Sequence, residues 1–269
     1  MIVFNGKLVS GEAVAVSPLG EGFQFGAGVF TTVRVREGRA EFLSEHAERL
    51  VRDARALVLA EGSEAGVLCE RCAACIAANG IVEGAIKIVW FADAEGGTGE
   101  MISQRAHTYG ADIFARGFRL MMMSCAVRAG RELSQHKTLN YLEHLRAKRA
   151  AVAAGFDEAL WVDERGVVLE GATTNVFAVI DGRLVTPDEQ AGLLPGVARR
   201  VVMRLGSVER VKTVMLTREM LMEAEEVFVT NALVGVMPVR AVDEREYSLV
   251  GNRVTREIAA GFARAAAGR

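Results

Sequence analysis

The sequence contains no run of 18 consecutive apolar residues and no run of five or more like charges. The first absence excludes a membrane-spanning helix, and the second excludes the basic stripe that follows a nucleic-acid backbone. The formal net charge is only -2, with both signs interspersed. We therefore expect a small-molecule ligand and no nucleic-acid or membrane partner. The first residues also lack the basic and apolar regions of a signal peptide, so we expect a cytoplasmic protein.

Cysteine is scarce as well, at four residues. Cys69, Cys72 and Cys75 are spaced like part of an iron–sulfur run, but no further cysteine follows before Asn79. Three-residue steps keep side chains near one face of a helix. We interpret these cysteines as small thiols buried on a helix face and predict no metal site.

The composition, 51% apolar and 25% charged over 269 residues, is that of a soluble globular protein with one large or two modest domains. The pattern weakens over 109–118, where we place a domain boundary. We predict a smaller N-terminal domain, 1–113, and a larger C-terminal domain, 114–269. No linker rich in proline or serine separates them, so the two halves should pack together.

The N-terminal half mixes strand and helix patterns. Asn5-Gly6 between apolar pairs predicts a hairpin over 2–9, and Glu37-Gly38 predicts a turn within 29–43. Ser44 is the expected N-cap of a helix over 44–60. A second helix is expected around 64–78 and a buried strand over 84–92.

The C-terminal half begins with a strand around 119–127 and a helix at whose entrance Lys137 lies. Three apolar runs over 158–187 predict a strand meander with a polar insertion at 170–175. A Pro-Gly turn precedes a helix ending near 205, and Thr230-Asn231 interrupts two apolar runs over 226–239. Both places can present backbone N–H groups to an anion.

Lysine is rare too, and the five lysines differ in their surroundings. Lys7 and Lys148 are expected to be solvated. Lys87 alternates with apolar neighbours on a strand, where it can be structural or contact an anionic substrate. Periodicity alone does not separate a catalytic from a structural Lys137.

Four segments occur in the order found in one known family: "FQFGAGVFTTVRV" with "EHAERL", "KTLNYLEHLRAKRAAVAAGFDEALWVDERGVVLEGATTN", "LLPGVARR" and "VFVTNALVGVMPV". With these, nearly the whole chain resembles the fold-type IV pyridoxal-phosphate enzymes. The group includes branched-chain aminotransferases, D-amino acid aminotransferases and 4-amino-4-deoxychorismate lyases. The resemblance implies an α/β (α+β) fold of two domains, with mixed sheets, flanking helices, the cofactor in the interdomain cleft, and a homodimer.

The resemblance also implies roles for individual residues. Lys137 would form the Schiff base with pyridoxal 5'-phosphate and shuttle the substrate proton, and Glu170 would lie beside the pyridine nitrogen. Arg49 would bind the phosphate through its planar fork of donors. The other expected cofactor residues are Asn175, Gly196, Val197, Ala198, Asn231 and Ala232.

Within this family, "Phe30-Thr31-Thr32" and "NALVGVMPV" favour 4-amino-4-deoxychorismate lyase, which eliminates pyruvate to give 4-aminobenzoate for folate synthesis. Thr31 would then join Lys137 as a catalytic residue. Ala27 replaces the usual aspartate, and the stretch 92–105 lacks the arginine elements of relatives. Candidate contacts for the substrate and its carboxylate are Phe30, Arg34, Lys87 and Arg105.

Two alternatives stay open. An aminotransferase of the same fold would act on branched-chain or D-amino acids, although such enzymes usually carry glutamate at the position of Thr31. A cofactor-binding or metal-binding protein without turnover would account for the altered stretch 92–105 and the three neighbouring cysteines.

Overall fold

The computed structural model describes residues 1–59, 62–106, 109–126, 128–205 and 211–268. It divides into two compact units, Met1–Thr108 with His136–Tyr141, and Tyr109–Gln135 with Leu142–Arg269. The domain boundary near residue 113 stays a prediction. The sequence did not reveal that the short segment around Lys137 packs with the first unit.

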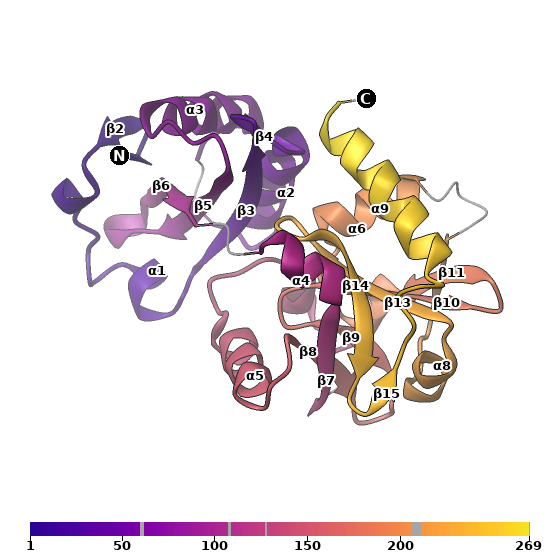
Figure 1. The fold of residues 1–269 in the computed structure, drawn as a ribbon. Helices are drawn as coiled ribbons and strands as arrows, with labels where there is room; N and C mark the ends of the chain where they lie inside the picture. The colour runs from indigo at the N-terminus through magenta and orange to yellow at the C-terminus, as the bar shows by residue number, and fades with distance from the viewer. Residues whose placement is uncertain (60–61, 107–108, 127, 206–210, 269) are drawn as a thin grey trace. The chain divides into compact units, whose positions relative to one another are not determined.

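The first unit contains an antiparallel sheet with the strand order β2-β1-β6-β5-β3-β4 in its described residues (Figure 1). The predicted hairpin over 2–9 is confirmed, because Asn5 and Gly6 take φ values of 45° and 77° in the turn. The strands are β1 (Ile2–Phe4), β2 (Lys7–Val9), β3 (Gly28–Arg36), β4 (Arg39–Ala40), β5 (Gly84–Ala92) and β6 (Thr98–Arg105).

Helices α2 (Leu43–Ala56) and α3 (Ala65–Ala78) cover one face of this sheet. Alternate side chains of β3 and β5, such as Val33 and Ile88, pack beneath them in the main core of the unit. Cys72 and Cys75 lie in the same core, on α3, as predicted for small apolar side chains, whereas Cys69, predicted to be buried with them, is only partly buried. The opposite face carries a smaller aromatic cluster that includes Phe30 and Phe91.

The predicted limits of α2 are wrong at both ends. Its N-cap is Phe42, which has a left-handed φ of 52° and makes no side-chain cap, so Ser44 lies inside the first turn. The helix ends at Ala56 because Val58 also takes a left-handed φ, 53°, which a continuing helix does not allow.

The segment that carries Lys137 forms a single β-bridge between two bends, and the predicted helix begins only at Leu142, so Lys137 lies before the helix entrance and not in it. Thr138 bridges Val29 of β3, the Phe30 N–H donates to the Lys137 carbonyl at 2.8 Å, and the Leu139 N–H donates to the Gly28 carbonyl at 2.8 Å. A Cβ at Gly28 would lie 2.7 Å from Leu139 Cδ1 of this segment and 2.6 Å from the Trp90 carbonyl oxygen of β5. The glycine therefore allows β3 to pair with both neighbours at this point.

The second unit contains a mixed sheet with the order β12-β11-β10-β13-β14-β7-β8-β9, and β15 pairs with β14. The predicted strands over 158–187 are present, but the predicted meander is wrong, because β8 pairs with β9 and β10 pairs with β11, and β13, β14 and β7 lie between these two hairpins in the sheet. The strands are β7 (Phe118–Cys125), β8 (Glu158–Asp163), β9 (Val168–Gly171), β10 (Asn175–Ile180), β11 (Arg183–Pro187), β12 (Val211–Val214), β13 (Glu226–Asn231), β14 (Gly235–Val242) and β15 (Arg245–Glu246).

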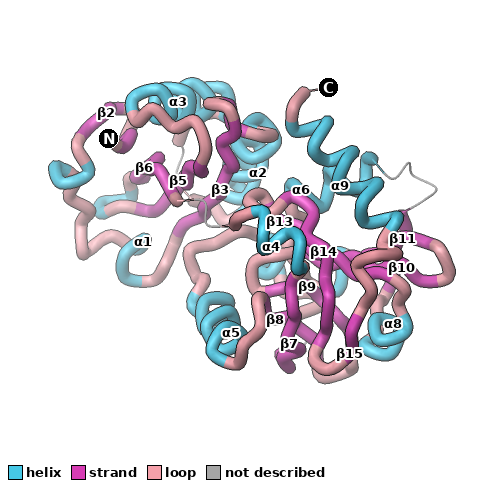
Figure 2. The backbone as a smooth tube through the Cα atoms, in the orientation of Figure 1, coloured by secondary structure: helices cyan, strands magenta, loops and turns pink. Residues whose placement is uncertain are grey.

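Helices pack against this second sheet (Figure 2). Helix α5 (Leu142–Ala153) lies on β8, and α6 (Val197–Leu205) and α9 (Arg253–Ala266) lie together against β13. The other helices of the described residues are α1 (Glu21–Gln24) in the first unit and α4 (Ala111–Arg116) and α8 (Arg218–Glu223) in the second. Short 3-10 turns are η1 (Gly11–Ala13) and η2 (Ala94–Gly96) in the first unit and η3 (Glu132–Gln135) and η4 (Glu189–Ala191) in the second. In the described residues, none of the helices has the length and apolar character needed to span a bilayer.

Candidate active site

In the first unit, Lys137 projects onto two aromatic side chains. Its Nζ lies 4.6 Å from the centre of the Phe30 ring and 4.8 Å from that of Tyr141, and 3.4 Å from the Tyr141 hydroxyl. The two rings meet edge to face with centres 5.1 Å apart. The amine is therefore held by ring faces and one hydroxyl, which gives it a defined direction.

Lys87 reaches the same aromatic ring from β5. It pairs with Thr32 across the sheet, so it shares the face of Phe30, and its Nζ lies 4.5 Å from the Phe30 ring centre. Burial, and then the charge of Arg105, lower the pKa of Lys87. A half-buried cation beside Lys137 on this face can attract an anionic group.

Thr31 points to the other face of β3, towards α2. Its hydroxyl oxygen lies 2.7 Å from His46 Nδ1 and accepts a hydrogen bond of 2.9 Å from Arg49 Nη2. All three side chains are buried. Thr31, predicted to be catalytic together with Lys137, therefore lies on the opposite face of the strand from Phe30, because side chains alternate along it.

The other candidates of this unit are more dispersed. Arg34 lies on β3 on the face of Phe30, half-buried, and burial and the nearby Arg36 lower its pKa. Arg105 is exposed at the end of β6. Much of the stretch 92–105 forms strand β6. Ala27, which replaces the usual aspartate, contributes its carbonyl, which accepts a backbone hydrogen bond from the Ala92 N–H.

In the second unit, Glu170 lies buried in β9. Its Oε2 accepts hydrogen bonds from Asn175 Nδ2 at 3.3 Å and from the Leu194 N–H at 3.2 Å. Arg128 Nη1 lies 3.8 Å from Oε1, and its guanidinium lies 4.9 Å from the Trp161 ring centre. Arg128 was not predicted from the sequence, because its segment carries no periodic signal.

Two glycines of the motifs are required by close packing. A Cβ at Gly171 would collide with Thr174 Oγ1, and one at Gly196 would collide with Asn175 Oδ1. Asn175 also donates to the Leu194 carbonyl at 2.8 Å, which fixes the turn leading into α6. Because α6 begins at Val197, the predicted residues Gly196, Val197 and Ala198 lie at its start, where backbone N–H groups can bind an anion.

Asn231 and Ala232 lie at the end of β13. Asn231 belongs to the strand, and the interruption predicted at Thr230-Asn231 falls later, between β13 and β14. Asn231 Oδ1 accepts hydrogen bonds from the Leu233 and Val234 N–H groups at 2.8 and 2.9 Å. Its Nδ2 donates to the Thr173 carbonyl at 3.1 Å, which joins this turn to the "LEGATTN" segment.

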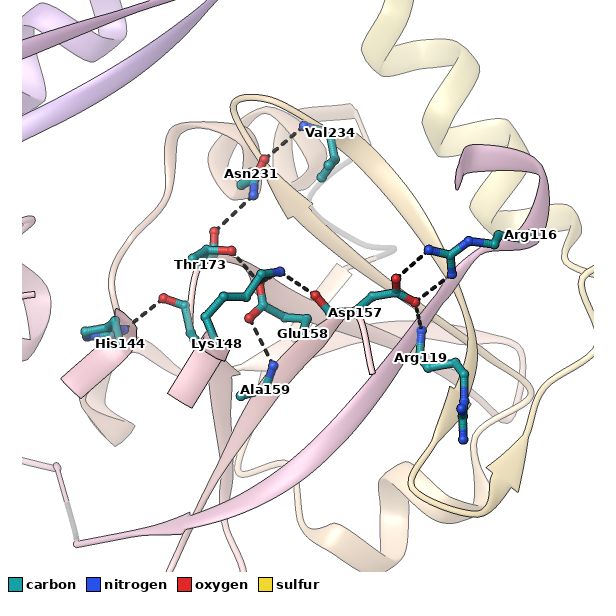
Figure 3. Close-up of polar contacts among 11 residues, drawn as sticks. Arg116, Arg119, His144, Lys148, Asp157, Glu158, Ala159, Thr173, Asn231 and Val234 are labelled. Carbon is teal, nitrogen blue, oxygen red and sulfur yellow. Dashed lines mark hydrogen bonds and ion pairs between the residues drawn. The ribbon is translucent and has the colours of Figure 1, made fainter. Parts of the chain in front are cut away.

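Beneath this junction lies a buried carboxylate (Figure 3). Glu158 accepts hydrogen bonds from the Thr173 hydroxyl and, at 3.0 Å, from the Ala159 N–H, and Lys148 Nζ lies 3.5 Å from it. Lys148 also donates to the Asp157 carbonyl, so the prediction that it is solvated is wrong. Burial raises the pKa of Glu158, and the charge of Lys148 opposes that rise.

Two buried hydroxyls next to these segments have no hydrogen-bond partner among the described residues: Thr174 Oγ1 and Thr230 Oγ1. Buried polar atoms are nearly always satisfied in folded proteins. With the buried Glu170 and the first turn of α6, this donor set fits a ligand that carries an anionic group and a protonated ring nitrogen.

Comparison with known proteins shows the family. The model of the family described as "Amino-transferase class IV" matches residues 28–242. A D-alanine aminotransferase of Staphylococcus epidermidis is 28% identical over 282 residues, covering 97% of this chain and 96% of that protein.

Solved structures show the same fold. That of a branched-chain aminotransferase from Thermoproteus uzoniensis with norvaline has a TM-score of 0.91 at 26% identity, covering 99% of this chain and 94% of that one. A Legionella pneumophila structure provisionally named 4-amino-4-deoxychorismate lyase has a TM-score of 0.87 at 24% identity, covering 95% and 97%, a likeness of fold alone. The predicted fold class and the resemblance to fold-type IV enzymes are confirmed. The chain therefore belongs to the class IV aminotransferase family, an enzyme family that uses pyridoxal 5'-phosphate.

Proposed function

We propose that this protein is a 4-amino-4-deoxychorismate lyase. The observation that carries the proposal is the arrangement at Phe30 and Thr31. The amines of Lys137 and Lys87 both lie over the Phe30 ring. On the opposite face of the strand, Thr31 supplies a buried hydroxyl where aminotransferases of the family carry glutamate. An amine beside a second cation suits a substrate with both an amino group and carboxylates.

The elimination breaks two bonds in the substrate. Lys137 Nζ takes the proton from the carbon that bears the amino group, and the ether C–O bond to the enolpyruvyl group then breaks as the ring becomes aromatic. The leaving group takes up a proton to become pyruvate. Lys87 would hold a substrate carboxylate, and Tyr141, whose hydroxyl lies 3.4 Å from Lys137 Nζ, would orient the amine during the proton transfer.

Bound pyridoxal 5'-phosphate supplies the electron sink for this chemistry. Glu170 would pair with its ring nitrogen, and Asn175 and the Leu194 N–H keep that carboxylate in place. Arg49 would bind the phosphate, with Thr31 fixing its guanidinium. The start of α6 at Gly196, Val197 and Ala198, and the turn after Asn231 and Ala232, would add backbone N–H donors.

An aminotransferase acting on branched-chain or D-amino acids is the second candidate. The names of the Staphylococcus epidermidis and Thermoproteus uzoniensis relatives favour it, and both match nearly the whole of this chain. Thr31 in place of glutamate distinguishes this chain from that pattern.

The first experiment records the visible absorbance of the purified protein with pyridoxal 5'-phosphate before and after borohydride, followed by peptide mass mapping. We expect a borohydride-fixed adduct on Lys137 in the wild type and in the control variant Lys7→Ala, and none on residue 137 in Lys137→Ala. An adduct confined to another lysine would refute the assignment of Lys137.

The second experiment separates the two activities. Release of pyruvate and 4-aminobenzoate from 4-amino-4-deoxychorismate supports the lyase. Formation of glutamate from 2-oxoglutarate and an amino acid, without release of 4-aminobenzoate from 4-amino-4-deoxychorismate, would establish the aminotransferase instead. The same proposal includes a homodimer located in the cytoplasm, which gel filtration with light scattering and cell fractionation test.

A further inference from the structure

A buried aspartate of α2 holds the backbone that carries Lys137. Asp53 is 1% exposed, and its carboxylate makes two contacts with the segment His136–Tyr141. Its Oδ1 lies 3.2 Å from His136 Nδ1, and its Oδ2 accepts a hydrogen bond of 3.3 Å from the Lys137 N–H. These contacts join positions 83 and 84 residues apart in the sequence.

Both backbone polar groups of Lys137 are therefore held from different elements. The N–H donates to Asp53 on α2, and the carbonyl accepts from the Phe30 N–H on β3 at 2.8 Å. Since the backbone on either side of Cα is fixed, the direction in which the side chain leaves it is fixed as well. The side chain then reaches the Phe30 and Tyr141 rings.

The two contacts of Asp53, with His136 and with the Lys137 N–H, suit a carboxylate. An ionised aspartate offers only acceptors, so its two oxygens can serve an imidazole N–H and a peptide N–H together. Arg52 Nη2 lies 3.3 Å from Oδ1 and balances the buried charge. An asparagine at this position would keep one acceptor oxygen and present an NH₂ group to the other donor.

We propose that Asp53 is a positioning residue for Lys137, acting through the Lys137 N–H and through His136. The inference rests on the proposed function in one respect, because it takes Lys137 as the reacting amine. Neither Asp53 nor His136 was predicted from the sequence to have a role at the site.

The chain offers a matched control in Asp163 of the second unit. Asp163 is also buried, and its Oδ1 accepts hydrogen bonds from the Arg165 and Val167 N–H groups at 2.9 and 3.0 Å. It too has an arginine partner, Arg165, at 2.9 Å. Asp163→Asn therefore reproduces the loss of a buried, backbone-binding carboxylate at a place that does not touch Lys137.

The first test is amide hydrogen exchange by mass spectrometry on the full chain without cofactor, for wild type, Asp53→Asn and Asp163→Asn. We expect exchange in peptides covering 136–141 to rise about tenfold in Asp53→Asn, the order expected for one hydrogen bond to a charged group. Asp163→Asn should leave these peptides at the wild-type rate and loosen only its own turn.

The second test measures how fast pyridoxal 5'-phosphate forms the borohydride-fixed adduct on Lys137. We expect a fall of about tenfold in Asp53→Asn and wild-type rates in Asp163→Asn, with far-ultraviolet circular dichroism unchanged in both. The absorbance of the loaded protein should also titrate at a different pH in Asp53→Asn, a change that a general loss of stability does not produce.

Wild-type exchange at 136–141 together with a wild-type adduct rate in Asp53→Asn would overturn the inference. If Asp53→Asn does not fold, His136→Ala takes its place, because the His136 side chain is 13% exposed and its removal disturbs the core less. Wild-type exchange and a wild-type adduct rate in His136→Ala would then overturn the inference. An absent wild-type adduct would refute the proposed function alone, because the exchange comparison needs no cofactor.

Discussion

Arg49 donates a hydrogen bond of 2.9 Å to the Thr31 hydroxyl inside the first unit. From the sequence, Arg49 was predicted to bind the cofactor phosphate and Thr31 to be catalytic together with Lys137. The structure places Arg49 and Thr31 in one buried contact with His46, on the α2 face of β3. Thr31 thus affects the site first through the direction of a guanidinium.

Replacement of Thr31 by valine tests this relationship. Thr31→Val keeps the shape and removes the acceptor, so Arg49 loses its fixed direction, and we expect the Kd for pyridoxal 5'-phosphate to rise about tenfold. A fluorescence titration of the protein with the cofactor measures this. Thr31→Ser, which keeps the hydroxyl, should bind nearly as wild type, and equal affinities in all three proteins would contradict the role.

Removal of Arg128 should destabilise the second unit. Its guanidinium is buried between Glu170 and the Trp161 ring, and loss of one partner leaves a buried charge with less compensation. We expect Arg128→Met to lower the free energy of unfolding by about 3 kcal/mol in urea titrations. Arg55→Ala, which breaks the exposed pair with Glu64, should cost less than about 1 kcal/mol. Similar losses in the two variants would argue against a buried network at Glu170.

The Lys148 and Glu158 pair should give stability a defined pH dependence. Burial raises the pKa of Glu158 and Lys148 lowers it, so Lys148→Met raises the pKa in the folded state further. A raised folded-state pKa means stability that is present at low pH and is lost as pH rises through that value. We expect Lys148→Met to lose more stability at pH 7.5 than at pH 5.

The double variant with Glu158→Gln is the control for this pH effect, because it removes the titrating group. The difference in free energy of unfolding between the double variant and Glu158→Gln should be the same at pH 5 and at pH 7.5. A loss in Lys148→Met that did not depend on pH would show that the ammonium contributes through packing and not through the charge of Glu158.

The cysteines of α3 should react in an order set by burial. Burial raises the pKa of the Cys72 thiol, and its side chain is closed off in the core, whereas Cys69 lies nearer the surface. Iodoacetamide at pH 8, followed by mass mapping, should label Cys69 first and Cys72 only after unfolding. Rapid labelling of Cys72 in the folded protein would contradict the position of this residue in the core.

The elements that were predicted correctly are those whose signals are local. Asn5-Gly6 specifies its own turn, and the alternation of β5 follows from its neighbours. The start of α2 was missed because Phe42 takes a left-handed φ that no local rule favours. Tertiary pairing of Thr138 with Val29 holds the Lys137 segment outside the following helix, and a window of the sequence around Lys137 does not contain that partner.

At the candidate site too, some residues could be predicted from local sequence signals and others could not. Motif order indicated Lys137 and Glu170, but not the residues that hold them, since Asp53 lies 84 positions from Lys137 and Arg128 lies in an irregular segment. The opposite directions of Phe30 and Thr31 could have been predicted from strand alternation alone.

The return of His136–Tyr141 to the first unit bears on how the chain folds during synthesis. A nascent chain that ends at Thr108 holds the helices and strands of that unit, yet the Phe30 N–H and the Gly28 carbonyl still await their partners. Those partners leave the ribosome only after a further stretch that belongs to the second unit. The first unit therefore cannot be completed until residues 109–135 of the second unit have been synthesised, and a fragment cut at residue 108 should expose an unpaired strand edge and aggregate.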